Sequence, residues 1–196
     1  MTMDMPKNVD TAINLLQSAG FEAYAVGGCV RDSLLGKTPN DWDITTSAKP
    51  EDMKSVFAEF HCIDTGIKHG TVTVVIDGEP LEITTFRLDG EYEDNRHPKS
   101  VTFTSNLGAD LGRRDFTVNA MAYSKKTGTV DLFGGQNDLK NKIIRCVGDP
   151  DRRFNEDALR ILRALRFASA LDFEIEEKTA QSLLKNRALL GNISEE

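Results

Sequence analysis

Two acidic residues set two positions apart, Asp41 and Asp43, are the strongest chemical signal in this 196-residue sequence. If 42–46 forms a strand, its period of two points both carboxylates to the same side. Adjacent carboxylates repel each other unless a cation lies between them. Mg²⁺ prefers hard oxygen ligands and is commonly held by one or two carboxylates together with substrate phosphates. The spacing therefore predicts a Mg²⁺ site for phosphate chemistry.

A glycine turn, Gly27-Gly28, lies shortly before this acidic pair and leads into a helix-like run that contains Arg31. Backbone N–H groups at a helix start, together with Arg31, would attract a phosphate. Taken alone, Gly-Gly is also a common turn, and Asp-x-Asp also caps loops or lines a solvated edge. Their combination favours a phosphate-binding turn beside a metal site.

This combination resembles the hallmark of the nucleotidyltransferase superfamily that includes DNA polymerase beta. More narrowly, the chain resembles the bacterial tRNA CCA-adding enzymes, a group shared with bacterial poly(A) polymerases. The resemblance implies an α/β head over 1–147, built on a mixed, largely antiparallel sheet with flanking helices, and an all-helical neck over 148–196. Relatives continue into body and tail regions that hold tRNA, so we expect a head-plus-neck portion.

The strands and helices that would position the site follow from sequence periodicity. Apolar spacing predicts a helix over 7–19, and β-branched runs over 71–77 and 81–87 predict a hairpin. Alternation in the second run places Glu82 opposite Leu81 and Ile83, on the face that could carry the two aspartates. A third carboxylate could bind metal or accept the proton of an attacking hydroxyl. A solvent-facing strand acid is the alternative, and the resemblance favours the catalytic role.

A second cluster lies in Arg113-Arg114-Asp115-Phe116-Thr117-Val118-Asn119-Ala120. On a helix from Asp115, Asp115 and Asn119 would share a face. Arg114 could bind a triphosphate, and Asp115 or Asn119 could hydrogen-bond a ribose hydroxyl. Capping and salt bridges explain these residues equally well. The stretch closely matches a motif of the CCA-adding group, in which the counterpart of Arg114 contacts nucleotide.

The segment from Asp149 is helical in composition, with Asn155 as a possible cap and arginines at every third position from Arg160. On that helix Asp157 and Arg160 are i,i+3 neighbours. Arg163 lies one step further, and Arg166 drifts to the edge of the same face. A solvated charged face is the simple interpretation. The resemblance gives a sharper one, because Asp157 and Arg160 occupy the Glu-Asp-x-x-Arg motif that reads the base.

The chemistry of that pair suits two bases. C and A both place an amino donor beside a ring-nitrogen acceptor, whereas U and G place a carbonyl beside an N–H. An aspartate can accept from the amino group while an arginine donates to the ring nitrogen. U and G would leave these groups mismatched, at about 1–3 kcal/mol for each unsatisfied group. Arg163 and Arg166 would support the pocket or contact phosphate.

The segment 88–99 is polar, rich in turn formers and without periodicity. Such segments beside a site are commonly mobile, although a plain surface loop has the same composition. In CCA-adding enzymes a similar loop is implicated in the switch from C to A addition. The resemblance therefore implies a loop involved in that switch.

Composition narrows the remaining possibilities. A net charge of −7 argues against a general nucleic-acid-binding surface, although the arginines between 151 and 170 reverse the sign locally. The three cysteines form no Cys-x-x-Cys pair, so neither a disulfide framework nor a zinc site is indicated. The sequence contains neither a long apolar run nor a signal-like start, so we expect no membrane association and a cytoplasmic location.

The expected activity is template-independent addition of C, C and A to tRNA 3′ ends from CTP and ATP. Two Mg²⁺ ions on Asp41 and Asp43 would serve an in-line transfer that releases pyrophosphate. Gly28, Arg31 and Arg114 would hold phosphate and sugar. The alternatives are a poly(A) polymerase, a relative that adds only CC or only A, and a non-catalytic nucleotide- or RNA-binding module.

Overall fold

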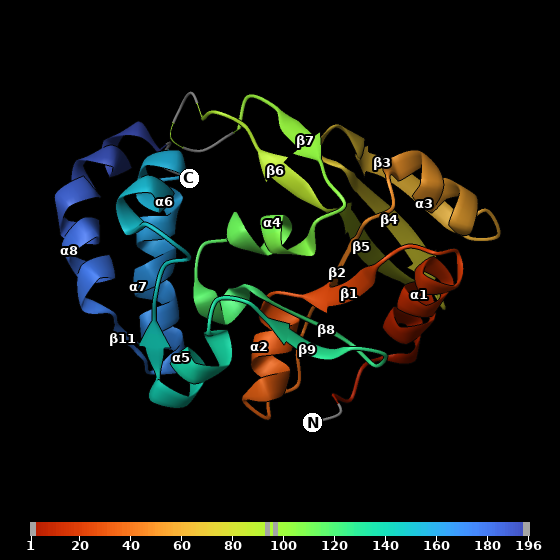
Figure 1. Cartoon of the computed structure of the whole chain (residues 1–196), viewed down its shortest axis with the longest axis horizontal. Coiled ribbons are helices and arrows are strands. Elements are labelled where there is room, and N and C mark those ends of the chain that lie inside the picture. Colours follow the sequence, from red (N-terminus) through yellow and green to blue (C-terminus); the bar gives the residue numbers. More distant parts are fainter. Residues whose placement is uncertain (1–2, 93–94, 96–97, 194–196) are drawn as a thin grey trace.

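A seven-stranded sheet forms the centre of the molecule in the computed structural model, which describes residues 3–92, 95 and 98–193 (Figure 1). The strand order is β3-β4-β5-β2-β1-β8-β9. β2 and β5 pair in parallel, and the other neighbours pair antiparallel, which confirms the predicted mixed, largely antiparallel sheet. Its strands are β1 Ala23–Val26, β2 Asp43–Thr46, β3 His61–Gly66, β4 Thr71–Ile76, β5 Glu79–Thr85, β8 Met121–Ser124 and β9 Gly128–Asp131.

Helices cover both faces of this sheet because each face carries apolar side chains. α1 (Lys7–Ser18) and α3 (Pro50–Val56) pack on one face, and α4 (Leu107–Gly112) packs on the other. α2 (Gly28–Leu34) follows β1 directly, and α5 (Gly135–Asn141) follows β9. The larger cluster contains fully buried side chains from helices and strands alike, including Ile13, Leu16, Ile44, Met53, Phe57, Val72, Val74 and Ile83.

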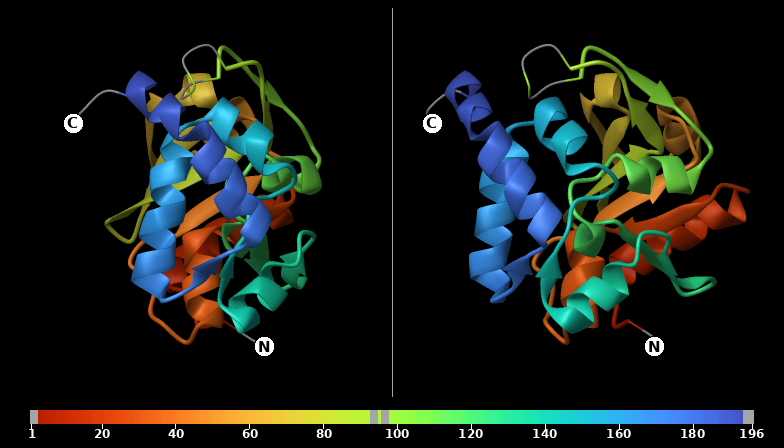
Figure 2. Two further views of the ribbon diagram at one scale, coloured as in Figure 1. Left: turned by 90° about the vertical axis from the view of Figure 1, so that its left-hand side faces the viewer. Right: turned by 60° about the vertical axis from the view of Figure 1, so that its left-hand side comes forward.

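The C-terminal part was expected to be all-helical, but it contains one short strand, which forms because its backbone pairs with a strand of the preceding segment. It consists of α6 (Pro150–Glu156), α7 (Leu159–Leu171), α8 (Glu177–Asn186) and a 3₁₀ helix, η3 (Arg187–Asn192). The strand β11 (Glu174–Ile175) pairs in parallel with β10 (Ile143–Ile144) and ties these helices to the preceding segment. The helices stand side by side at one end of the molecule, as Figure 2 shows. The division at 147 stays a prediction.

Two predicted helices differ from those observed. The helix expected from Asp115 is a single 3₁₀ turn, η2 (Thr117–Asn119), and Phe116 before it is extended. The reason is tertiary: the N–H of Thr117 donates to the carbonyl of Arg145, and the N–H of Val147 donates to that of Asp115. In an α-helix the carbonyl of Asp115 would accept the N–H of Asn119, but here it accepts that of Val147, and the N–H of Asn119 donates to the carbonyl of Phe116 instead.

The helix expected to run on from Asn155 also breaks. α6 ends at Glu156, Asp157 is extended with φ −142° and ψ 103°, and α7 begins at Leu159. The Asp157 carboxylate accepts the N–H of Leu159 at 3.0 Å, which satisfies an orphan donor at the start of α7. Asp157 therefore lies at a helix junction rather than on the helix.

The loop predicted over 88–99 begins as a strand, because β6 (Arg87–Asp89) pairs with β7 (Val101–Phe103) in a two-stranded ribbon. A bridge between Tyr92 and Pro98 continues the pairing. Positions 93, 94, 96 and 97 of the predicted C-to-A switching loop lie outside the described residues. Among the helices that the structure describes, none has the length and apolar character needed to span a bilayer.

Candidate nucleotide-binding site

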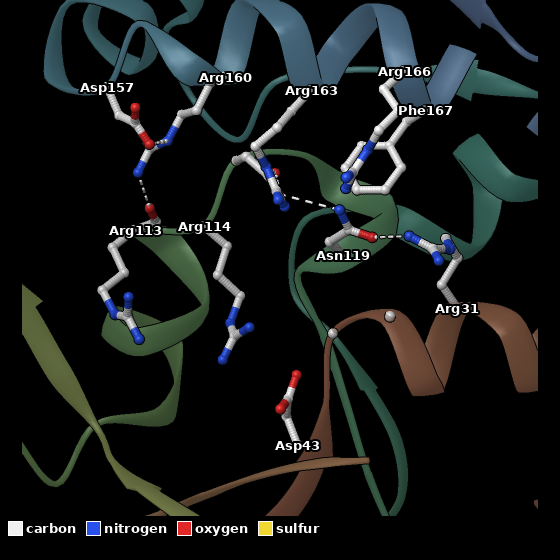
Figure 3. A pocket seen from close by; sticks show the side chains of 13 residues that line it. Arg31, Asp43, Arg113, Arg114, Asn119, Asp157, Arg160, Arg163, Arg166 and Phe167 are labelled. Carbon is white, nitrogen blue, oxygen red and sulfur yellow. Dashed lines mark hydrogen bonds and ion pairs between the residues drawn. The ribbon is translucent and has the colours of Figure 1, made fainter. Parts of the chain in front are cut away.

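A cavity of about 420 Å³ lies between the sheet and α7, with Asp43 at its base and the α7 side chains across its top (Figure 3). It collects residues from β2, α2, the end of α4, η2 and α7. Every residue predicted to bind nucleotide lines it. Those residues are Gly27, Gly28, Arg31, Arg114, Asp115, Asn119, Asp157, Arg160, Arg163 and Arg166.

The predicted catalytic carboxylates also lie near one another. Thr45 of β2 lies beside Thr84 of β5. Asp43 lies two residues before Thr45, and Glu82 lies two residues before Thr84. Because side chains alternate along a strand, the two acids point to the same face as the two threonines. Asp41 precedes β2 and lines, with Asp43 and Glu82, a second cavity of about 710 Å³. Asp43 borders both cavities and so stands where they meet.

The surroundings of Asp43 favour a cation. Nearby protein displaces water and raises the pKa of this carboxyl, Arg114 lowers it, and the carboxylates of Glu82 and Asp41 raise it further, with a net increase. Across the described part of the chain, no three His, Cys, Asp or Glu side chains are placed to hold a metal ion by themselves. A Mg²⁺ ion here would therefore need further oxygen ligands from substrate phosphate and water.

The glycine turn has a backbone that only glycine adopts easily. Gly27 has φ 84° and ψ −131°, and a Cβ there would lie 3.4 Å from an Nη atom of Arg114. Gly28 opens α2, and a Cβ on it would lie 3.6 Å from an Nη atom of Arg31. The two arginines therefore lie close to the turn that was predicted to bind phosphate.

Arg31 is fixed by two partners. Its guanidinium donates to both oxygens of Asp32, at 2.8 and 3.0 Å, and to the side-chain oxygen of Asn119 at 2.7 Å. The amide of Asn119 in turn donates to Asp115 at 3.2 Å, so the two residues meet although they share no α-helix. Asp115 also accepts from Arg163 on α7 at 2.7 Å. This chain of bonds joins α2, η2 and α7 across the cavity.

Asp157 and Arg160 lie together at the other end of α7. The Nε of Arg160 is 3.9 Å from the Asp157 carboxylate. Its Nη atoms donate to Glu156 at 3.0 Å and to the carbonyl of Arg113 at 3.1 Å. Arg160 is only 7% exposed, so these bonds leave it little freedom. Both residues line the cavity and so place a guanidinium donor beside a carboxylate acceptor there.

Asp110 is a structural residue of the site that sequence patterns did not indicate. It is fully buried on α4, and its carboxylate accepts from Arg113 at 2.9 Å and from Arg114 at 3.4 Å. It also accepts from the hydroxyl of Thr45 at 3.1 Å. Burial alone would raise the pKa of Asp110. The charges of Arg113 and Arg114, with hydrogen bonds from the Arg113 side chain and the backbone N–H of Arg87, outweigh burial and hold the pKa below its ordinary value.

We expect Asp110→Asn to lower the free energy of unfolding by about 3–5 kcal/mol, because it leaves buried guanidinium groups without their counter-ion. Urea unfolding at neutral pH would measure this. Because the folded-state pKa is lowered, the stabilisation is present above the unfolded-state pKa and is lost as the pH falls through the folded-state pKa. The difference in free energy of unfolding between the variant and the parent should therefore become smaller as the pH is lowered.

Asp10→Asn supplies the matched control, since the Asp10–Lys125 pair lies at the surface and should contribute about 1 kcal/mol or less. An Asp110→Asn loss no larger than the Asp10→Asn loss would contradict the structural role of Asp110.

The charge of the cavity is opposite to that of the whole chain. Six arginines and three aspartates line it, whereas the chain carries a net charge of −7. Clustered cations in a cleft attract polyanions even on an acidic protein. Two lining residues, Arg113 and Phe167, were not predicted as site residues. The helical spacing of α7 could have indicated Phe167, since it lies four residues after Arg163 and seven after Arg160 and so shares their face.

A glycine turn, paired acids on a mixed sheet and an adjoining arginine-rich cavity define the architecture of the nucleotidyltransferase class. The chain belongs to the family of the poly A polymerase head domain, whose family model matches residues 23–145.

Relatives and solved structures agree with this assignment. The chain is 58% identical over 184 residues to a CCA-adding enzyme of Lactobacillus helveticus, covering 94% of this chain and 46% of that protein. A crystal structure of the Bacillus stearothermophilus CCA-adding enzyme in complex with CTP matches with a TM-score of 0.87 and 44% identity, covering 97% of this chain and 46% of that one. A Thermotoga maritima CCA-adding enzyme complexed with tRNA matches with a TM-score of 0.76 and 29% identity, covering 95% of this chain and 43% of that one. The chain thus spans about half the length of these relatives.

Proposed function

We propose that this chain is the catalytic head and neck of an enzyme that adds C, C and A to tRNA 3′ ends from CTP and ATP. The observation that carries the proposal is the convergence of all the predicted nucleotide-binding residues on one cavity with Asp43 at its base. We take 1–147 as the head and 148–196 as the neck. A cytoplasmic location is part of the proposal.

The donor chemistry fits Mg²⁺ as the metal cofactor. Asp41, Asp43 and Glu82 offer hard oxygen ligands beside a cavity rich in arginine, which is the setting in which Mg²⁺ binds carboxylates and phosphates together. When bound, Mg²⁺ would lower the barrier to attack by a 3′-hydroxyl and neutralise charge on the triphosphate. Asp41 and Asp43 would hold it, and Glu82 would act as a further ligand or accept the proton of the hydroxyl.

The other residues would bind and orient the nucleotide. Gly27, Gly28, Arg31 and Arg114 would hold its phosphates, because the turn and both guanidinium groups lie together. Asp115 and Asn119 would contact the ribose.

At the start of α7, Asp157 and Arg160 would read the base edge shared by C and A. Further along the helix, Arg163 and Arg166 would complete the wall of the pocket and contact phosphate.

The tRNA end would approach through the second cavity. That cavity is lined by all three carboxylates and by Trp42 and Pro80, and it meets the nucleotide cavity at Asp43. A 3′-hydroxyl placed there would face the α-phosphate across Asp43, which suits an in-line displacement. The aromatic and proline side chains offer an apolar surface for a terminal nucleoside.

The proposal is tested by single-nucleotide transfer. A tRNA acceptor lacking CCA, at high concentration, is incubated with Mg²⁺ and each labelled nucleoside triphosphate in turn. We expect addition of C, then C, then A, and no extension with UTP or GTP alone.

The alternatives predict other products in the same assay. A long tail grown from ATP alone would identify a poly(A) polymerase, and an arrest after CC, or addition of A alone, would identify a partial adder. If no transfer occurred and nucleotide binding did not respond to Mg²⁺, a binding module would be the better assignment.

A further inference from the structure

Three guanidinium groups surround one aromatic ring in the nucleotide cavity. The Cζ atoms of Arg31, Arg163 and Arg166 lie 5.1, 5.1 and 5.0 Å from the centre of the Phe167 ring. Arg31 comes from α2, whereas Arg163 and Arg166 come from α7, as Figure 3 shows. The ring itself lines the cavity. Phe167 is therefore the point at which cations from two distant segments meet.

Like charges so close together repel, and a ring between them lowers that cost. The face of a benzene ring is electron-rich and attracts cations within about 6 Å of its centre. Phe167 is itself held by an edge contact with Phe116, at 5.9 Å between centres and 83° between planes. Phe116 is fully buried, so the ring rests on the core. Contact with the ring restricts the conformations open to the three arginines, which lowers the entropy cost of binding a ligand.

Arg166 differs from the other cavity arginines. The others pair with carboxylates: Arg31 with Asp32, Arg113 and Arg114 with Asp110, Arg160 with Glu156, and Arg163 with Asp115. With the described residues Arg166 makes no hydrogen bond or ion pair, and its contact is the ring of Phe167. An exposed guanidinium without a protein counter-ion has its hydrogen-bond donors available to an anion.

The position along α7 indicates which part of a nucleotide this group would meet. Arg166 lies six residues beyond Arg160, or roughly 9 Å along the helix axis at 1.5 Å per residue. Asp157 and Arg160 mark the end proposed for the base. The ring and its arginines mark the opposite end, where Arg31 also lies beside the glycine turn. This separation suits phosphates rather than the base.

We propose that Phe167 is a positioning residue: its ring gathers Arg31, Arg163 and Arg166 into the site that takes the outer phosphates of the incoming triphosphate. This inference rests on the proposed function, since it assigns a part of the same nucleotide site. The ring also links the head to the neck, so the triphosphate site is complete only when α7 stands against α2. Phe167 makes no contact with the reacting atoms in this scheme.

The test compares binding of CTP with binding of CMP by calorimetry, because the two share base and sugar and differ in the outer phosphates. We expect Phe167→Leu to weaken CTP binding by roughly tenfold, from the loss of several cation–π contacts. CMP binding should change by about twofold or less. Phe167→Tyr keeps the ring and should restore the CTP to CMP affinity ratio.

Phe173→Leu is the matched control, because it removes a buried ring from the C-terminal part that does not line the nucleotide cavity. It should lower the melting temperature without altering the ratio. Equal losses of CTP and CMP binding in Phe167→Leu, or no loss, would overturn the inference while leaving the proposed function intact. A parent chain that binds neither nucleotide would overturn both.

Discussion

The Asp41→Asn/Asp43→Asn double variant is expected to lose nucleotide transfer by at least roughly 1,000-fold, because removal of both charges abolishes metal-assisted stabilisation of several kcal/mol. Asn keeps the size of each side chain, so the strand β2 and its pairings should persist. The effect should appear in the rate of single-nucleotide addition to a tRNA acceptor under saturating CTP. Binding of CTP without Mg²⁺ should stay close to that of the parent, since the arginines that line the cavity are untouched.

A control variant that loses two negative charges elsewhere distinguishes a loss of metal binding from an effect of the overall charge. Glu59→Gln/Asp64→Asn removes two exposed carboxylates near α3 and β3, away from both cavities. Its transfer rate should equal that of the parent within about twofold, because exposed charges contribute little, including the surface pair of Asp64 with Lys54. A double variant at Asp41 and Asp43 that kept a tenth or more of the parent rate would show that these aspartates are not the metal ligands.

Asp157→Ala is expected to reduce the preference for CTP and ATP over UTP and GTP by roughly 10- to 100-fold, the equivalent of one or two unsatisfied polar groups. The physical reason is that Asp157 supplies the acceptor for the amino group that C and A share. Arg160 would still donate to a ring nitrogen, held by Glu156 and the carbonyl of Arg113. Competition between labelled nucleotides in one transfer reaction would measure the preference directly.

The same substitution removes a side-chain acceptor of a backbone N–H at the start of a helix, so its control must do likewise. Asp149 caps α6 by accepting the N–H of Asp151, much as Asp157 accepts that of Leu159 at the start of α7. Asp149→Ala should cost a similar amount of stability, about 1 kcal/mol, with no change in nucleotide preference. If both variants kept the parent preference, the base-reading role of Asp157 would be wrong.

Local sequence determined the parts of this fold that depend on near neighbours. The helix over 7–19 and the β4–β5 hairpin follow from apolar periodicity and turn residues. The structure has the helix at Lys7–Ser18 and the two strands at Thr71–Ile76 and Glu79–Thr85. The alternation that set Glu82 opposite Leu81 is likewise a property of any strand. The short strands β3, β8 and β9 were missed. β8 pairs with β1, which lies far away in the sequence, whereas β3 and β9 are edge strands that pair with their sequence neighbours β4 and β8.

Tertiary structure determined the local conformation wherever backbone groups form hydrogen bonds with segments distant in the sequence. Asp115 and Asn119 meet, but through a 3₁₀ turn that pairing with the Arg145 and Val147 backbone imposes. Asp157 reaches the cavity from a junction between two helices rather than from a helix face. Long-range contacts of this kind override local propensity, and a single sequence carries no direct record of them.

Residue type and spacing therefore determined which side chains could do chemistry in this protein, because carboxylates, glycines and arginines have the same chemical preferences in any fold. Only the tertiary structure decided how they are held. The buried Asp110 that anchors Arg113 and Arg114, and the Phe167 ring that gathers three arginines, both act across segments far apart in sequence. Such support depends on packing between elements, which local periodicity does not encode.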